Sequence, residues 1–305
     1  MSTVKTKKPR MLFSAFLRKY GRILIGGTIL AVVFFCVIFA DQLDMGYPHD
    51  SFTFDATLQN GSIKPGGVDT FGGKHIMGTD QLGRDIWSRI LHGGRPTLLV
   101  ALGAQTMLIV MGTVVGLLCG YYNKVERVVM RILEAFATIP NMLLTMLVMS
   151  LFTFNSEKSM IENCLPMMLS MSIHGVPGLA RMIRNQVLSL REKEYIESEK
   201  AMGAGDMRTI FVHILPACSS YLLVRFSNGL AGMVLSMASL SYLGLGIPTL
   251  EYPTWGSIVS DNKRALMNPE YMHAFLYPTL LVSATVFAFV MLGDGLRDLL
   301  DPRLK

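Results

Sequence analysis

The sequence predicts an all-α membrane protein with six transmembrane helices. Of its 305 residues, 51% are hydrophobic and only 16% are charged, whereas a soluble domain usually carries about 25% charged residues. Long apolar runs account for this difference, and six of them approach the roughly 20 residues that a spanning helix requires. These runs are Ile23–Ala40, Pro96–Gly120, Ile132–Phe154, Cys164–Ala180, Ala217–Leu245 and Ala274–Leu292.

The order of basic and apolar segments predicts the organisation of the chain. Residues 1–22 form a basic cytoplasmic tail, and residues 23–40 form a retained first helix, since no small-x-small cleavage site follows them. Residues 41–95 form an extracytoplasmic loop that includes an interfacial helix. We expect a core of five helices over residues 96–294, with a cytoplasmic loop over residues 181–216, and a cytoplasmic tail over residues 295–305.

Lysine and arginine residues predict the orientation. With the N-terminus inside, the inner segments hold 20 of the 28 basic residues and the outer segments hold 8. Basic residues are enriched on the cytoplasmic side of membrane proteins, so both termini are expected in the cytoplasm. The net charge of +6 is explained by this distribution, which argues against a nucleic-acid partner and for the lipid bilayer.

The end of the outer loop has the pattern of a helix. Thr79 or Asp80 can cap it, Leu82, Ile86 and Ile90 recur at intervals of four residues, and Gly93-Gly94 can end it before Pro96 starts the first core helix. His49, His75 and several aspartates of this loop match no ligand spacing, and we expect no metal site. The four cysteines are far apart and are expected to be apolar packing residues.

The centres of the six runs lack Asp, Glu, Lys and Arg. Charged residues inside a membrane usually mark ion paths, so their absence argues against a proton- or sodium-coupled carrier. His174 is expected to be a packed, neutral side chain. The sequence contains neither a Gly-x4-Gly-Lys-Ser/Thr loop nor a His-Glu-x-x-His pair. If transport is active, another polypeptide must supply its energy.

The largest cytoplasmic loop predicts two short helices joined by a hinge. Strong helix formers fill residues 190–202, Gly203 can take the left-handed terminating conformation, and Asp206 can cap a second helix over residues 207–214. Pro216 is expected to break the chain before the fifth span. Such a rigid, bent element suits a groove on a partner protein, but an amphipathic connector on the membrane surface fits the same pattern.

The loop resembles the Glu-Ala-Ala…Gly…Leu-Pro signature of binding-protein-dependent ABC importer permeases. Glu197, Gly203 and Leu215-Pro216 fall on its fixed residues. Three further stretches resemble the C-type permease subunit of the oligopeptide/dipeptide/nickel branch, so the resemblance covers most of the chain. They are Gly78-Thr79-Asp80-x-x-Gly83-Arg84-Asp85, Leu240-Ser241-Tyr242-Leu243-Gly244-Leu245-Gly246 and Gly293-Asp294-Gly295-Leu296-Arg297-Asp298-x-x-Asp301-Pro302-Arg303.

This resemblance implies a type I ABC importer permease fold in a prokaryotic cell membrane. It also implies a transporter subunit that binds no cofactor itself and is not an enzyme. The partners would be a second permease subunit, an extracytoplasmic substrate-binding protein and two ATPase subunits, which use ATP and Mg. The loop would dock into an ATPase cleft through residues Glu197, Ser198, Glu199, Gly203, Ala204, Gly205, Asp206, Leu215 and Pro216.

The chain departs from the signature where Ser198-Glu199 replaces the two alanines. Glu199 adds a charge to the coupling helix, and we expect this charge to favour a particular basic groove on the partner.

Small polar residues in the third and fifth runs are candidates for a water-filled path, although such residues also serve close helix packing. These candidates are Thr138, Asn141, Thr145, Asn228, Ser236 and Ser239. The substrates implied by the resemblance are oligo- or dipeptides. Nickel or another small solute remains an alternative cargo, and an ATPase-independent carrier remains an alternative class.

Overall fold

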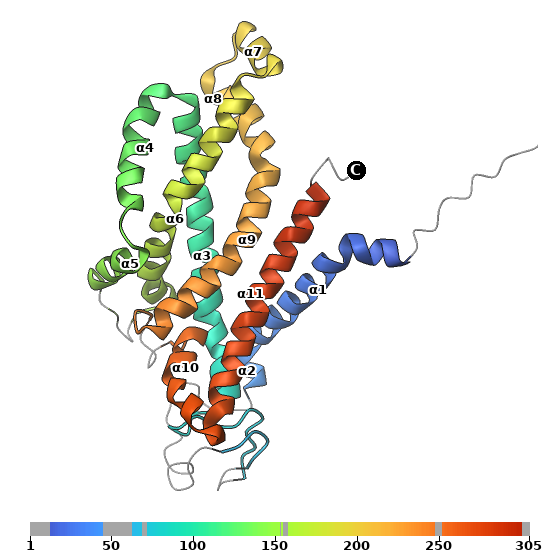
Figure 1. The fold of residues 1–305 in the computed structure, drawn as a ribbon, viewed down its shortest axis with the longest axis vertical. Helices are drawn as coiled ribbons and strands as arrows, with labels where there is room; N and C mark the ends of the chain where they lie inside the picture. Colours follow the sequence, from blue (N-terminus) through green and yellow to red (C-terminus); the bar gives the residue numbers. More distant parts are fainter. Residues whose placement is uncertain are drawn as a thin grey trace, which may run out of the picture.

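A computed structural model describes residues 13–44, 63–68, 72–152, 154, 158–247 and 252–300 (Figure 1). These residues are almost entirely helical, apart from two isolated β-bridges that join Val68 to Lys74 and Thr79 to Asp85. The α-helices are α1 Phe13–Ile38, α2 Ala40–Leu43, α3 Ile86–Tyr121, α4 Asn123–Ala137, α5 Asn141–Ser150, α6 Met160–Arg191, α7 Glu194–Ala201, α8 Asp206–Arg208, α9 Leu215–Tyr242, α10 Trp255–Asp261 and α11 Met272–Leu300. A π-helix η1 covers Thr209–Ile214, and 3-10 helices η2 and η3 cover Lys263–Met267 and Pro269–Tyr271.

Four helices in the described part of the chain are long and apolar enough to cross a membrane. They cover Tyr20–Ile38, Ile86–Tyr121, Asp206–Tyr242 and Pro269–Leu300, which contain most of the first, second, fifth and sixth predicted runs. The third predicted run is instead a pair of helices, α4 and α5, bent by 92°. The bend follows from Pro140, because proline disfavours helical backbone at the residue before it. Counting this pair as one crossing gives five candidate spans.

The fourth predicted run lies inside α6, a 32-residue helix that is too polar to qualify by composition. Its cytoplasmic half carries Arg181, Arg184 and Arg191. Two of its serines are buried, and their hydroxyls donate to backbone carbonyls, including that of Ala104 on α3 at 3.0 Å from Ser172. The six-span count expected from the sequence therefore depends on α6 and on the α4–α5 pair.

Helices α3 and α6 lie side by side (Figure 1) and pack through a row of glycines on α3. Gly112, Gly116 and Gly120 recur every four residues, so they share one face of α3. A Cβ atom at these positions would lie within 2.7 Å of a side-chain atom of α6; at Gly116 it would lie 2.6 Å from Cβ of Ile183. The absence of side chains therefore allows the two backbones to approach closely.

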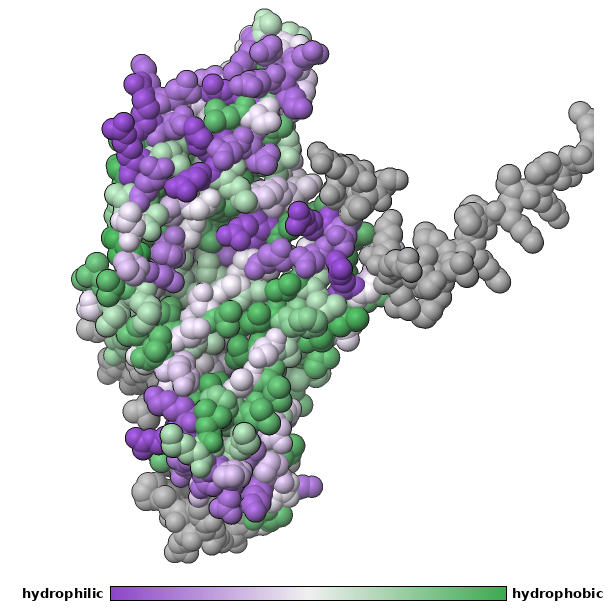
Figure 2. Space-filling model, in the orientation of Figure 1, coloured by the Kyte–Doolittle hydropathy of each residue, from purple (hydrophilic) through white to green (hydrophobic). Residues whose placement is uncertain are grey.

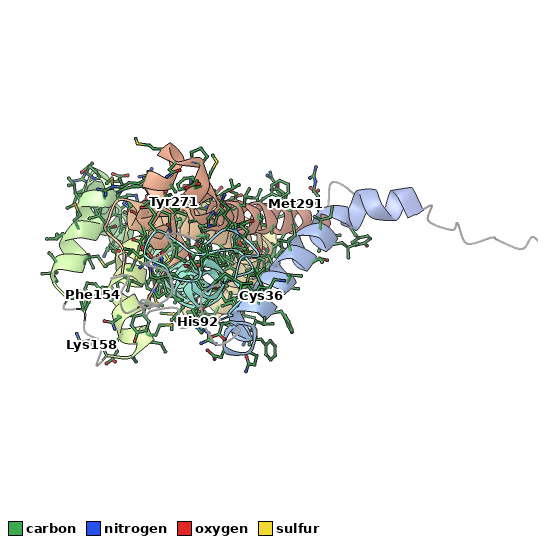
Figure 3. The ribbon with its side chains drawn as sticks, turned by 90° about the horizontal axis from the view of Figure 1, so that it is seen from below. Cys36, His92, Phe154, Lys158, Tyr271 and Met291 are labelled. Carbon is green, nitrogen blue, oxygen red and sulfur yellow. The ribbon has the colours of Figure 1, made fainter. Side chains whose placement is uncertain are left out.

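Helix α11 lies between α9 and α1. Gly26 of α1 faces the backbone of α11, where a Cβ atom would lie 2.6 Å from the carbonyl oxygen of Ala288. Arg22 of α1 pairs with Asp298 at 3.1 Å. Viewed from below, Phe154 and Lys158 of the hairpin before α6 lie at the opposite side of the molecule from the projecting end of α1 (Figure 3).

The end of the outer loop differs from the prediction, because residues 86–95 belong to α3 and form no separate interfacial helix. Helix α3 starts at Ile86, where Asp85 caps it by accepting a hydrogen bond from the amide of Ser88 at 2.7 Å. It then continues through Gly93, Gly94 and Pro96. The glycines provide close packing instead of an end: a Cβ atom at Gly94 would lie 2.2 Å from a methyl group of Val37.

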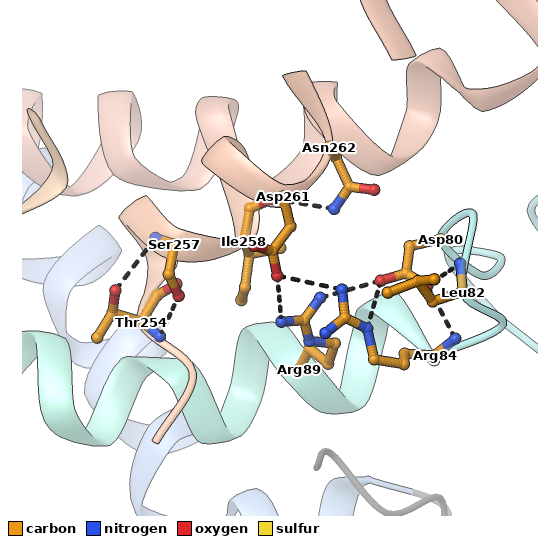
Figure 4. A network of polar contacts seen from close by, with 9 residues as sticks. All are labelled: Asp80, Leu82, Arg84, Arg89, Thr254, Ser257, Ile258, Asp261 and Asn262. Atoms are coloured by element: carbon orange, nitrogen blue, oxygen red, sulfur yellow. Dashed lines mark hydrogen bonds and ion pairs between the residues drawn. The ribbon is translucent and has the colours of Figure 1, made fainter. Parts of the chain in front are cut away.

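Thr79 and Asp80 do not cap the helix, because Asp80 belongs to a buried ionic network (Figure 4). Its carboxylate contacts Arg84 at 2.7 Å and Arg89 at 3.0 Å, and both arginines also contact Asp261 of α10, at 3.1 and 3.0 Å. The network joins the outer loop to the segment between α9 and α11.

His75 pairs with the capping residue Asp85 at 2.8 Å. No cluster of three metal-ligating side chains occurs among the residues that the structure describes. His49 lies outside them.

The molecule has hydrophilic ends and a hydrophobic belt (Figure 2). Helix α7 lies at one end, and α10 with the outer loop lies at the other (Figure 1). This distribution matches a protein whose middle section faces lipid.

Candidate coupling loop and translocation path

The predicted coupling loop projects from the cytoplasmic ends of α6 and α9 (Figure 1). Its first helix is α7, which is shorter than the predicted helix over residues 190–202, because α6 continues to Arg191. Ile196 is fully buried and anchors α7 to the rest of the chain. Tyr195, Met202 and Met207 are exposed by 48%, 79% and 58%. The loop therefore presents large apolar side chains to its surroundings while one buried residue fixes its position.

Gly203 has the left-handed conformation expected from the sequence, with φ of 91°. Its amide donates to the carbonyl of Lys200 at 2.9 Å, and the amide of Ala204 donates to that of Glu199 at 3.1 Å. These bonds end α7 and turn the chain toward Gly205. A Cβ atom at Gly203 would meet nothing within 4 Å, so the backbone angle and not space restricts this position to glycine.

The sequence predicted that Asp206 caps the second helix, but Gly205 occupies the N-cap position of α8. The carboxylate of Asp206 instead accepts hydrogen bonds from the hydroxyls of Tyr121 at 2.7 Å and Tyr122 at 3.3 Å. Both tyrosines stand at the cytoplasmic end of α3. Desolvation and the negative charge of Asp206 raise the pKa of Tyr122, so its hydroxyl keeps the proton that it donates. The loop is thus tied to α3.

Glu199, expected to face the partner, forms an ion pair with His213 of η1. The side chains of Glu199 and His213 are only 19% and 26% exposed. The carboxylate therefore points toward its own chain, and its contact with a partner stays a prediction. Ser198 is exposed and donates to the carbonyl of Glu194 at 2.8 Å, so it adds no free donor to the surface.

Leu215 and Pro216 begin α9 without the predicted break, and Asp206–Tyr242 forms one continuous helical segment. Pro216 has no amide hydrogen and cannot complete a regular helical turn. The preceding turn is a π-helix, in which the amide of Leu215 donates to the carbonyl of Ile210, five residues earlier. The wider turn accommodates the proline and keeps the helix axis continuous.

The candidate path residues fall into two groups that the single chain does not bring together. Thr138, Asn141 and Thr145 surround the bend between α4 and α5, where Thr145 is fully buried. Asn228, Ser236 and Ser239 lie on α9.

Two residues of the second group, Asn228 and Ser239, line two different cavities between α9 and α11. Asn228 lines a cavity of about 440 Å³ near the cytoplasmic end, together with Arg225 and Arg297. Ser239 lines a cavity of about 370 Å³ nearer the outer end, together with Thr279 and Ser283.

Residues 112–305 match the family described as "Binding-protein-dependent transport system inner membrane component". The chain belongs to this family. It is therefore a multi-pass inner membrane permease and not an ATPase, and the resemblance found in the coupling loop and the three other stretches is confirmed.

Several curated relatives are similar over nearly the whole chain. The glutathione transport system permease protein GsiD of Pectobacterium atrosepticum is 32% identical, covering 100% of this chain and 96% of that protein. The dipeptide transport system permease protein DppC of Haemophilus influenzae is 30% identical over 99% and 98%. The di/tripeptide transport system permease protein DppC of Pseudomonas aeruginosa is 30% identical over 92% and 88%.

Sequence reasoning missed the residues that hold the coupling loop in place. Tyr121 and Tyr122 form a doublet at the end of an apolar run, and the ammonium group of Lys200 lies 4.8 Å from the centre of the Tyr121 ring. An aromatic doublet beside a predicted cytoplasmic loop was the available signal. His213 carried a weaker signal, because its partner Glu199 lies 14 positions away and across a hinge.

Proposed function

We propose that the chain forms half of the translocation pathway of a peptide importer and couples it to separate ATPase subunits. It has six spans in a type I importer permease fold, with both termini in the cytoplasm. Helix α6 supports the six-span count, since its 32 residues extend about 48 Å and it packs against α3, which is of spanning length.

The distribution of Lys and Arg supports this orientation. The segments placed in the cytoplasm hold 20 of the 28 basic residues, and the outer segments hold 8. Three of the outer arginines are held by acidic neighbours: Arg84 and Arg89 pair with Asp80 and Asp261, and Arg95 pairs with Asp41 at 2.7 Å.

The coupling loop is the single observation that carries the coupling role. A helix of eight residues, ended by a left-handed glycine, projects beyond the bundle and exposes Tyr195, and the loop also exposes Met202 at the end of this helix and Met207 on α8. Exposed aromatic and methionine side chains on a short, bent helical loop suit insertion into a groove of a partner. The partners are two ATPases, which use ATP and Mg, a second permease subunit and an extracytoplasmic binding protein.

The substrates are peptides. This assignment rests on the names of the relatives, which transport peptides, dipeptides, di/tripeptides and glutathione. The outer cavity with Ser239, Thr279 and Ser283 supplies hydroxyl groups that can bond to a peptide backbone without selecting side chains. The polar group at the α4–α5 bend, with Thr138 and Asn141, lines the path from the other side once a second permease is present.

Reconstitution with the ATPases and the sister permease tests this function. Wild-type chain should co-purify with them and support ATP-dependent uptake of a labelled dipeptide, and Gly203→Asp should reduce both association and uptake. The same liposomes should not accumulate nickel. Flux without ATPases, or full uptake by Gly203→Asp, would contradict the proposal.

A further inference from the structure

A cavity of about 440 Å³ lies between α6, α9 and α11. Arg225 of α9 and Arg297 of α11 both line it, and its described lining residues include neither Asp nor Glu. Two guanidinium groups in one cavity repel each other unless an anion lies between them.

These arginines are not neutralised by the described part of the chain. Neither forms an ion pair with a described residue. On α11, the nearby Asp298 is engaged by Arg22 at 3.1 Å, and Asp294 does not line the cavity. The buried hydroxyl of Tyr221, another lining residue, finds no hydrogen-bond partner among the described residues. The site therefore presents hydrogen-bond donors and positive charge, which a negatively charged hydrogen-bond acceptor would complement.

Arg225 lies near the inner edge of the hydrocarbon core. It precedes Tyr242, at the outer end of α9, by 17 residues, which is about 26 Å of helix against a core about 30 Å thick. A long arginine side chain can extend from this depth to the lipid phosphates. A hydrophilic patch lies over the cytoplasmic halves of α9 and α11, at the border of the hydrophobic belt (Figure 2).

Part of the lining is apolar. Met182, Val224 and Leu300 line the cavity beside the two arginines and the polar side chains of Ser220 and Asn228. A ligand that fits must combine an anionic group with a hydrocarbon chain, because a free inorganic anion would leave these walls against water.

We propose that this cavity binds an anionic phospholipid of the inner leaflet. The guanidinium groups of Arg225 and Arg297 donate to the phosphate oxygens, and the first part of an acyl chain lies against Met182, Val224 and Leu300. A zwitterionic lipid is disfavoured, since its own cation would enter a site whose described lining has two positive charges and no carboxylate. Asn228, a predicted path residue, then contacts lipid and not the transported peptide.

Lipid retention by the purified, assembled importer tests the proposal. Native mass spectrometry would count the molecules of phosphatidylglycerol or phosphatidylcholine that remain bound in detergent. Wild type should retain phosphatidylglycerol with an affinity at least about tenfold above that of the double variant Arg225→Gln/Arg297→Gln, because two charge-assisted contacts are removed. Arg127→Gln, at an exposed arginine of α4 outside the cavity, should behave as wild type, and phosphatidylcholine retention should be equal in all three.

Three results would overturn the proposal. One is equal retention of phosphatidylglycerol by wild type and the double variant. Another is displacement of the lipid by inorganic phosphate at the same concentration, which would make the site one for free anions. The third is loss of the sister permease from the double variant in lipid-free detergent, which would make the cavity a protein contact. If the double variant does not fold, Arg297→Gln alone, at an exposed position, should still lower retention severalfold.

Discussion

The ion pair between Glu199 and His213 makes a sharp prediction about the coupling loop. Replacing Glu199 by Ala should loosen α7 from η1, because it removes the acceptor from a histidine that is only 26% exposed. Exposed pairs contribute up to about 1 kcal/mol, and breaking a fully buried pair costs about 3–5 kcal/mol. For side chains with 19% and 26% exposure, we expect a coupling energy of about 1–2 kcal/mol, which is about 5- to 30-fold in the opening equilibrium of the loop.

A double-mutant cycle with Glu199→Ala and His213→Ala measures this coupling energy. The readout is hydrogen exchange of the α7 amides in the assembled importer, where each single variant should speed exchange and the double variant should add little. Glu194→Ala is the matched control, since Glu194 is exposed on the same helix and is not among the residues predicted to contact the ATPase; it should leave exchange unchanged.

The cycle also separates an internal contact from a contact with the ATPase. If Glu199 faced the ATPase, Glu199→Ala would lower ATPase affinity equally with and without His213. Additive effects of the two substitutions on exchange, within about 0.3 kcal/mol, would refute the internal ion pair.

Four further predictions concern the loop, the helix seam and the outer network. Gly203→Ala should cost about 1–2 kcal/mol, because φ is 91° there, and should reduce ATPase stimulation by substrate. Gly116→Val should destabilise the α3–α6 pair by about 1–3 kcal/mol through overpacking, measured by thermal unfolding in detergent; Gly178→Ala, where a Cβ atom meets nothing within 4 Å, is the control. Asp261→Asn should cost about 1–3 kcal/mol, because Arg89 keeps only Asp80 as its charged partner, and limited proteolysis of the outer loop would report the loss. The pKa of Tyr122 is raised in the folded protein, so its contribution to stability is present below the ordinary pKa of about 10 and is lost as pH rises through the folded-state pKa. Tyr122→Phe should therefore flatten the alkaline side of a plot of unfolding free energy against pH and leave the acid side unchanged.

Apolar helices and local backbone conformation could be predicted from the sequence. Four runs are helices of spanning length, and Gly203 has the expected left-handed conformation. These features depend on short-range composition and on the one residue that tolerates positive φ. The family assignment was readable for a similar reason, because its motifs are local.

Features that depend on contacts between distant segments were not readable. Gly93 and Gly94 carry the pattern of a helix end, but α3 continues through them because Trp255 and Val37 pack against their bare backbone. Asp80 carries the pattern of a helix cap, but Arg89 and Arg84 take its carboxylate. Glu199 was expected at the partner surface, and His213 turns it inward. In each case a tertiary neighbour outweighs the local preference.

The continuous helical segment Asp206–Tyr242 connects the coupling loop to the outer side of the membrane. Its 37 residues extend about 55 Å, so a tilt of about 5° about its midpoint displaces each end by about 2.4 Å. The π-helical turn before Pro216 preserves this stiffness, whereas a proline break would have absorbed the motion near the coupling loop. Such a tilt, started by a small movement at Gly203 and Asp206, would therefore displace Ser239 and the outer cavity in the opposite direction.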